Sequence, residues 1–403
     1  MNIDLRFYSL RTSIAVLSIA VVAISTCDLG IAAAPSPQQI DAHLKTIANV
    51  GAQGAGSAEA REARRSLAAD CDAGSLPKIL VAMDTKNIVA ANWLRSVYED
   101  VVRRELANPA ATFPTPFLRE FVQDSGHEGR VRRLVLDLLN RLDPKFGPAT
   151  IPTLLEDPEF RDDAVAAVMK SADAERVGGR NDAAVKLYRT AFTHARESGQ
   201  VTAIADQLSA LGTKADIVEH LGFVVDWHLV GPFDAPEKTG YDLKLPPETN
   251  IDLAATYPGQ GGMEIRWKRF RTEDRMGSVD LAQAIAPVKE AIAYAYTELD
   301  SQKAAAVQLR CSADDNLSVW LNGEKVFGRG QWLNGTRLDR FVTPVNLRAG
   351  KNVVLVKCCQ GPQHSDPSVG NAWSMQLRFC TEDGAGVALK SLLPPVDASQ
   401  AKK

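Results

Sequence analysis

The sequence predicts a multidomain protein in which an α-solenoid-like helical domain is followed by a β-sandwich with jelly-roll topology. At 403 residues the chain is too long for a single core, since domains average about 150 residues. Apolar residues recur every three or four positions in the first half and at alternate positions in the second. We therefore expect a helical repeat-like domain at 35–215, a junction at 216–221 and the sandwich at 222–385.

The segment 1–34 has the pattern of a signal peptide. Two arginines precede a run of apolar or small residues over 14–24, and the small residues over 31–34 suit a signal peptidase. The run is too short for a membrane span, which needs about 20 apolar residues. We therefore expect an exported protein, periplasmic or extracellular, whose mature chain has no membrane span. A lipid anchor at Cys27 is the alternative, but the bulky threonine before this cysteine disfavours it.

Helical spacing begins with the first predicted helix, where Ile40, Leu44, Ile47 and Val50 share one face. Proline and glycine separate this helix from others of the same kind. Successive short helices of this type can pair antiparallel and stack as a solenoid. The further helical segments are 76–83, 88–106, 117–124 and 131–142.

One helical stretch carries a recognisable pattern. Gly179, Ala184, Tyr188 and Ala191 follow the spacing G-x4-A-x3-Y-x2-A, which resembles the core of a tetratricopeptide repeat. The alanines allow neighbouring helices to approach closely, and the tyrosine fills the space between them. The upstream helices resemble irregular HEAT-like repeats, and an ordinary helical hairpin is the alternative. Such repeats imply a platform for protein interaction.

The second half alternates apolar and polar residues, as strands with one buried face do. The alternation is clearest over 307–311, 317–322 and 373–379, while the apolar run 353–356 is typical of a central strand. Turn residues separate these segments. Frequent turns between short strands favour a β-sandwich.

Several sequence blocks in this half carry a family resemblance. Residues 227–233 read W-H-L-V-G-P-F, residues 314–323 read D-D-N-L-S-V-W-L-N-G, and residues 347–352 read L-R-A-G-K-N. These blocks resemble galactose-binding-like jelly-roll modules of large exported bacterial proteins and the sugar-binding-like sandwich of glycoside hydrolase family 2. The resemblance covers about 222–382. It implies a jelly-roll fold, and such modules often serve as non-catalytic accessory domains.

Trp320 is the centre of the predicted ligand site. By alternation it shares a side of its strand with Ser318 and Asn322, so it should point away from the inner core. A flat ring beside amide and carboxylate groups suits sugar binding. The alternative is that the loop 328–334 covers the ring and that Asn322 serves only in a turn. The predicted ligand-binding residues are Trp320, Asn322, Asp314, Asp315 and Trp332.

The sequence contains no catalytic constellation. The motifs of zinc proteases, serine hydrolases, phosphate-binding loops and C-x-x-C oxidoreductases do not occur, so we expect no enzymatic activity and no cofactor. Asp314 and Asp315 could offer oxygens to Ca²⁺, although an Asp-Asp turn makes similar local hydrogen bonds without a metal. The net charge of −3 indicates no nucleic-acid partner.

Four cysteines lie on predicted strands: Cys311, Cys358, Cys359 and Cys380. Strand alternation places the first two on the core side and the other two on the opposite side. Because exported proteins meet an oxidising environment, we expect at least one disulfide within this set.

Together these features predict an exported, non-catalytic binding protein. Its sandwich would recognise a carbohydrate or cell-envelope glycan, and its helical domain would bind protein. The alternatives are an envelope scaffold without sugar binding and an accessory part of a glycoside hydrolase system. The polar, proline-containing end of the chain, 386–403, is expected to be disordered.

Overall fold

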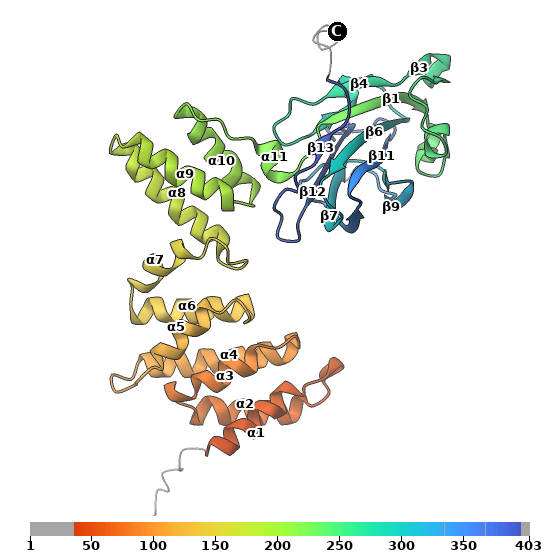
Figure 1. Ribbon diagram of the computed structural model, residues 1–403. Coiled ribbons are helices and arrows are strands. Elements are labelled where there is room, and N and C mark those ends of the chain that lie inside the picture. Colours follow the sequence, from red (N-terminus) through yellow and green to blue (C-terminus); the bar gives the residue numbers. More distant parts are fainter. Residues whose placement is uncertain (1–35, 334, 367, 396–403) are drawn as a thin grey trace, which may run out of the picture. The chain divides into compact units, whose positions relative to one another are not determined.

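A computed structural model describes residues 36–333, 335–366 and 368–395. It confirms the predicted fold class, because helices fill the first part of the chain and antiparallel sheets follow (Figure 1). The predicted signal peptide, 1–34, and Cys27 lie outside the described residues. Within the described ranges, no helix has the length and apolar character needed to cross a bilayer.

The chain forms two compact units, and the first contains the described residues up to Gln123 together with Arg130–Val135. Its first helix begins at a capping box, in which Ser36 and Gln39 satisfy each other's backbone N–H groups. The apolar face predicted from the sequence is buried, with Ile47 fully inaccessible. The helices of this unit are α1 (Pro37–Ala48), α2 (Ser57–Asp70), α3 (Leu76–Met83), α4 (Ile88–Leu106) and α5 (Thr115–Gln123).

The second unit contains Asp124–Gly129 and the chain from Leu136 onward, so the division between units falls within α6 (Gly129–Leu142). The tetratricopeptide-like spacing forms a packed helical hairpin here. Ala184, Tyr188 and Ala191 are fully buried, and Tyr188 Oη donates to Asp173 Oδ1 at 2.5 Å. The other helices before the strands are α7 (Phe146–Thr150), α8 (Arg161–Val177), α9 (Asn181–His194), α10 (Ser198–Ala210) and α11 (Ile217–Leu221).

Two antiparallel sheets form the sandwich. The large sheet has the strand order β4-β1-β6-β11-β8-β9, with β13 also paired to β6, and the small sheet has the order β10-β7-β12-β5. The strands of the large sheet are β1 (Asp226–Asp234), β4 (Lys268–Arg271), β6 (Ala291–Ser301), β8 (Leu317–Leu321), β9 (Glu324–Arg329), β11 (Gly350–Gln360) and β13 (Lys390–Ser391). Those of the small sheet are β5 (Val279–Asp280), β7 (Ala305–Ala313), β10 (Phe341–Leu347) and β12 (Ser374–Cys380). A short helix, α12 (Leu281–Ala284), follows β5, and β2 (Thr256–Pro258) pairs with β3 (Glu264–Arg266).

The inner faces of the two sheets enclose an apolar core that includes Trp227, Leu309, Val354 and Phe379. A second cluster lies on the outer face of the large sheet, beneath the long segment between β1 and β4. This segment carries β2, β3 and three short 3₁₀ helices, Pro236–Tyr241, Pro246–Glu248 and Gln260–Gly262. The outer face of the large sheet is therefore largely covered by chain that is not part of the sheet.

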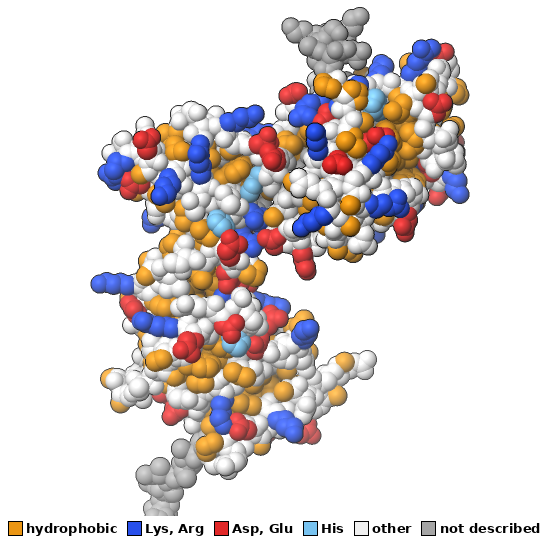
Figure 2. Space-filling view, in the orientation of Figure 1, with side chains coloured by type: hydrophobic (Ala, Val, Ile, Leu, Met, Phe, Trp, Pro, Cys, Tyr) orange, Lys and Arg blue, Asp and Glu red, His pale blue; other side chains and the backbone are white. Residues whose placement is uncertain are grey.

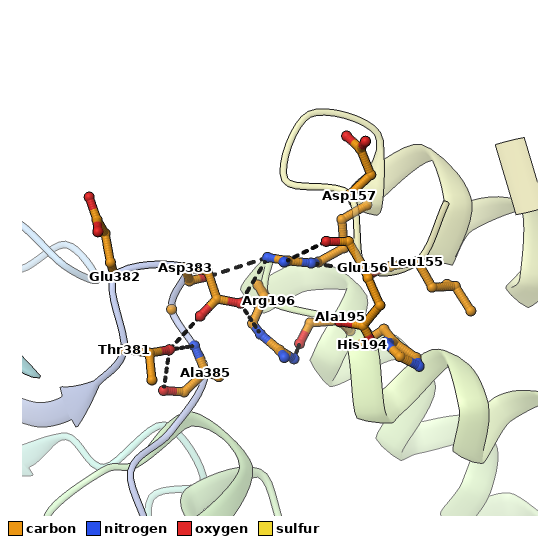
Figure 3. Close-up of polar contacts among 12 residues, drawn as sticks. Leu155, Glu156, Asp157, His194, Ala195, Arg196, Thr381, Glu382, Asp383 and Ala385 are labelled. Atoms are coloured by element: carbon orange, nitrogen blue, oxygen red, sulfur yellow. Dashed lines mark hydrogen bonds and ion pairs between the residues drawn. The ribbon is translucent and has the colours of Figure 1, made fainter. Parts of the chain in front are cut away.

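Helices α8–α11 belong to the same compact unit as the sandwich, and direct contacts join them. Phe223, just before β1, lies in one apolar cluster with Leu221 of α11. Asp383, on the connection after β12, contacts Arg161 Nη1 at 3.2 Å and Arg196 Nε at 3.5 Å. Figure 3 shows the side chains of Asp383 and Arg196 facing each other, joined by a dashed line. Helical and strand-rich parts thus share packing and charge contacts within this unit.

The end of the chain corrects one expectation. Part of the segment predicted to be disordered, 386–403, is ordered, because Lys390 and Ser391 form β13 against β6. Leu392 N also donates to Glu298 O at 2.9 Å. Residues 396–403 lie outside the described residues.

The expected disulfide does not form in this structure, where Cys71, Cys311, Cys358, Cys359 and Cys380 are buried free thiols. Cys311 and Cys358 lie in the core between the sheets and Cys359 lies in the outer cluster, each on the predicted side. Cys380 follows the core residue Phe379 on β12, so its side chain faces the outside of the small sheet. Both sheets therefore separate Cys359 from Cys380, and only Cys311 and Cys358 share a layer.

Candidate functional site

Trp320 lies on the outer face of the large sheet, as strand alternation predicts. The pairing register places it between Leu355 of β11 and Lys325 of β9. The same row continues through Tyr296 of β6 to His228 of β1. Trp320 is half-buried, whereas Leu355 and Tyr296 in the middle of the row are covered. The row is therefore accessible at the β8–β9 end.

Two further rings and two lysines complete this end, which we call the aromatic strip: Trp320, Tyr241, Trp332, Lys325 and Lys238. Lys325 Nζ lies 5.3 Å from the ring centroid of Trp320 and 5.0 Å from that of Tyr241. Lys238 Nζ lies 5.5 Å from the ring centroid of Trp332. The three rings are half-buried and the two lysines are exposed.

Glycines let the chain approach the rings of the strip. A Cβ atom at Gly328 would lie 2.7 Å from Tyr241 Oη, and one at Gly330 would lie 3.6 Å from the Tyr241 ring. A Cβ atom at Gly361 would lie 2.8 Å from the Trp332 ring. The stretch from β9 to Trp332 therefore packs directly against Tyr241, which brings the three rings onto one surface.

A buried ion pair fixes the segment that carries Tyr241. Lys357 of β11 is only 2% exposed, and its Nζ contacts Glu248 Oε1 at 2.9 Å. The same ammonium donates to the carbonyl oxygens of Tyr241, at 3.4 Å, and of Leu243. Glu248 also accepts from Tyr294 Oη at 2.5 Å. Burial, together with this carboxylate, raises the pKa of Tyr294, so the phenol remains a donor.

Asp314 and Asp315 are buried, and their oxygens are occupied by backbone N–H groups. Asp315 accepts from Leu333 N at 2.8 Å and from Gly361 N at 2.7 Å, while Asp314 accepts from Ala372 N at 3.1 Å and from Gly335 N. Burial raises the pKa of Asp315 despite these hydrogen bonds. The two carboxylates thus anchor the loop around Trp332 instead of facing a ligand. Across the described ranges, no group of three or more His, Cys, Asp or Glu residues is placed to hold a metal ion.

Asn322 has a structural role in the β8–β9 turn. Its backbone has φ = +54°, a conformation that asparagine tolerates better than most residues. Its Oδ1 accepts from Val353 N at 2.9 Å, and its Nδ2 donates to Asn352 Oδ1 at 3.1 Å. Of the five predicted site residues, the structure brings Trp320 and Trp332 to the accessible surface and uses the other three as supports.

A large groove lies elsewhere, along β1 and β4, with a volume of about 1640 Å³, and none of the five predicted residues lines it. Within it, Asp226 lies 2.5 Å from both Arg269 and Arg271. Burial, helped by Arg269, lowers the pKa of His228 in the same groove. Figure 2 likewise shows charges of both signs interspersed over the visible face, without a patch of one sign.

Sequence reasoning missed Tyr241, Lys325 and Lys238. Tyr241 and Lys238 come from the segment between β1 and β4, which no periodicity links to the β8–β9 strands. The nearest signal is the pair Gly328 and Gly330 at the end of β9, since glycines at a strand end indicate close approach of another chain segment.

No protein-family model and no curated protein matches this sequence. Among solved structures, a Faecalibacterium prausnitzii β-glucuronidase is similar over 40% of this chain, with 11% identity and a TM-score of 0.23. The similar region spans 31% of the glucuronidase chain.

Proposed function

We propose that the protein is an exported, non-catalytic binding protein whose aromatic strip recognises a carbohydrate. The observation that carries this proposal is the placement of three half-buried rings, Trp320, Tyr241 and Trp332, on one surface beside the β8–β9 edge. The resemblance of this half to galactose-binding-like modules supports the same reading.

The chemistry of such a surface suits a sugar. An aromatic ring packs against the apolar C–H face of a pyranose, while neighbouring polar groups take its hydroxyls. Tyr241 and Trp332 lie on segments whose backbone is hydrogen-bonded by the buried side chains of Lys357, Asp314 and Asp315. Because these anchors fix the rings before binding, little conformational entropy is lost when a ligand binds.

The test is retention of the chain from residue 35 on a glycan array and on insoluble polysaccharides. Trp320→Ala and Tyr241→Ala should abolish retention and leave the melting temperature nearly unchanged. Trp93→Ala is the matched control, because Trp93 is also half-buried but lies on α4 of the helical part. Retention of the wild type on no glycan, or equal loss in the control, would contradict the proposal.

A protein-interaction scaffold is the second candidate, and three exposed apolar side chains on the first unit favour it. Val81 at the end of α3 and Ile88 and Val89 at the start of α4 are 56%, 61% and 45% exposed. Contiguous exposed apolar surface is typical of a protein contact, and these three side chains are its candidates on this unit. Under this alternative, Ile88→Asp should abolish chemical cross-linking to an envelope protein, whereas Trp320→Ala should leave the cross-linking unchanged.

A further inference from the structure

We infer that the ligand of the aromatic strip is an acidic glycan, a sugar that carries carboxylate, sulfate or phosphate groups. This inference rests on the proposed carbohydrate function and adds the class of sugar. It is carried by Lys325 and Lys238, the two cations that lie over the rings.

The charges of these two lysines are not neutralised by protein. Neither has an acidic partner among the described residues. Other lysines on the outer face of the same sheet do have one, since Lys351 contacts Glu298 at 2.5 Å and Lys357 contacts Glu248 at 2.9 Å. Lys351 and Lys357 of β11 are therefore paired with acids, whereas Lys325 and Lys238 of the strip are not.

Ring contact holds each ammonium in place while leaving its charge available. The attraction of a cation to an exposed aromatic face is weak; it is enough to favour a position but not enough to neutralise a charge. An acidic sugar can draw the ammonium to the ring edge through its anionic group and place its C–H face on the ring. A neutral sugar must displace the same cation without that compensation.

The two lysines lie over different rings of the strip. Lys325 lies over the rings of both Trp320 and Tyr241, and Lys238 lies over the ring of Trp332. Tyr241 packs against Gly330, two residues before Trp332. A polymer that carries several anionic groups therefore meets two separate cation–ring pairs in the strip.

Affinity electrophoresis with matched polymers tests the inference on the chain from residue 35. Carboxymethylcellulose is compared with hydroxyethylcellulose, and dextran sulfate with dextran, so that each pair differs in charge but shares its backbone. We expect at least about tenfold tighter binding to the charged member, a free-energy difference of about 1.4 kcal/mol. We also expect this preference to shrink as salt rises, because exposed charges are screened.

Lysine variants separate the strip from general charge. Lys325→Gln and Lys238→Gln should each remove most of the preference for the charged polymer, and Lys325→Arg should keep it. Lys268→Gln is the control, because this exposed residue lies on β4, at the opposite edge of the same sheet. An equal loss with Lys268→Gln would overturn the inference in favour of non-specific attraction.

The outcomes also separate this inference from the proposed function. Equal, salt-insensitive binding to charged and neutral polymers that depends on Trp320 would overturn the acidic ligand and leave carbohydrate binding intact. Binding to no polymer in either pair, nor to any sugar of the array, would overturn both.

Discussion

The inner layer of the sandwich and its two outer faces are buried by different means. Between the sheets the side chains are apolar, and they include Trp227, Leu309 and Val354. Each outer face instead carries a cation that is only 2% exposed and is paired with a carboxylate from a loop. On the large sheet Lys357 contacts Glu248 at 2.9 Å, and on the small sheet Arg378 Nε contacts Asp339 Oδ1 at 2.7 Å.

This difference shows how one sandwich keeps a fixed core and still positions irregular chain on both outer surfaces. Apolar packing between the sheets is non-directional. It requires only that the side chains fill the space between the sheets. A buried cation is directional, because it must receive several oxygen partners to offset its desolvation. Lys357 receives them from the segment that carries Tyr241, so the outer face selects one conformation for part of the aromatic strip.

We expect the inner layer to be destabilised most by substitutions that remove buried side-chain volume. Trp227 is fully buried, so Trp227→Ala should lower the free energy of unfolding by about 3–5 kcal/mol. Urea unfolding followed by near-ultraviolet circular dichroism measures this. Trp320→Ala, on the outer face, should cost about 1 kcal/mol or less. Similar losses for both variants would show that the two layers do not differ in this way.

We expect the outer face of the large sheet to be destabilised most by substitutions that leave a buried charge without its partner. Lys357→Met leaves Glu248 without its cation in a largely buried position, and should cost about 3–5 kcal/mol. A second substitution, Glu248→Gln, removes the stranded charge and keeps an acceptor for Tyr294 Oη. The double variant should therefore be more stable than Lys357→Met alone. A double variant no more stable than the single one would place the cost in lost packing.

The outer face of the small sheet should be sensitive to acid. Burial acts to raise the pKa of Asp339, but hydrogen bonds from Arg378 and Arg310 outweigh it, so this pKa lies below its ordinary value of 3.8. Because the unfolded chain then binds the proton more readily, this pair stabilises the fold above about pH 4. That contribution is lost as the pH falls through the lowered pKa.

Asp339→Asn should cost about 1.5–3 kcal/mol at neutral pH, since it weakens hydrogen bonds to charged groups. The difference in the free energy of unfolding between Asp339→Asn and wild type should become smaller as the pH falls from about 5 to about 2.5. Thermal unfolding across this range measures both. Asp315 is a useful contrast, because burial raises its pKa and its contribution has the opposite pH dependence. If the stability difference between wild type and Asp339→Asn does not change with pH, the lowered pKa of Asp339 is not the source of this stability.

The smallest expected effect is that of a reductant. Because the five described cysteines are free thiols, dithiothreitol should leave the melting temperature unchanged. Burial raises the pKa of both Cys311 and Cys359 to about 12, so these thiols should react with Ellman's reagent only after unfolding. Peptide mapping that finds a Cys311–Cys358 bridge in exported protein would contradict this and restore the disulfide expectation for the one pair that shares a layer.

Strand alternation predicted the side on which Trp320 lies, and the parity of Cys311 and Cys358, because the period of a strand is a local property. We also expected Asp314, Asp315 and Asn322 to lie beside the tryptophan as ligand-binding groups. Their oxygens instead bind backbone N–H groups of Leu333, Gly361 and Val353, which are distant in sequence. Whether a polar side chain faces a ligand or a loop depends on which segment folds over it.

The sequence by itself determined the order of helix and strand, the amphipathic faces and the hairpin around Tyr188, because each follows from the spacing of residues along a short stretch. Only the tertiary structure brought Tyr241 to Trp320 and Trp332, ordered Lys390 and Ser391 against β6, and left the cysteines unpaired. These outcomes depend on contacts between segments far apart in the chain. No local pattern encodes such contacts, because they are selected by the pairing of buried polar groups across the whole fold.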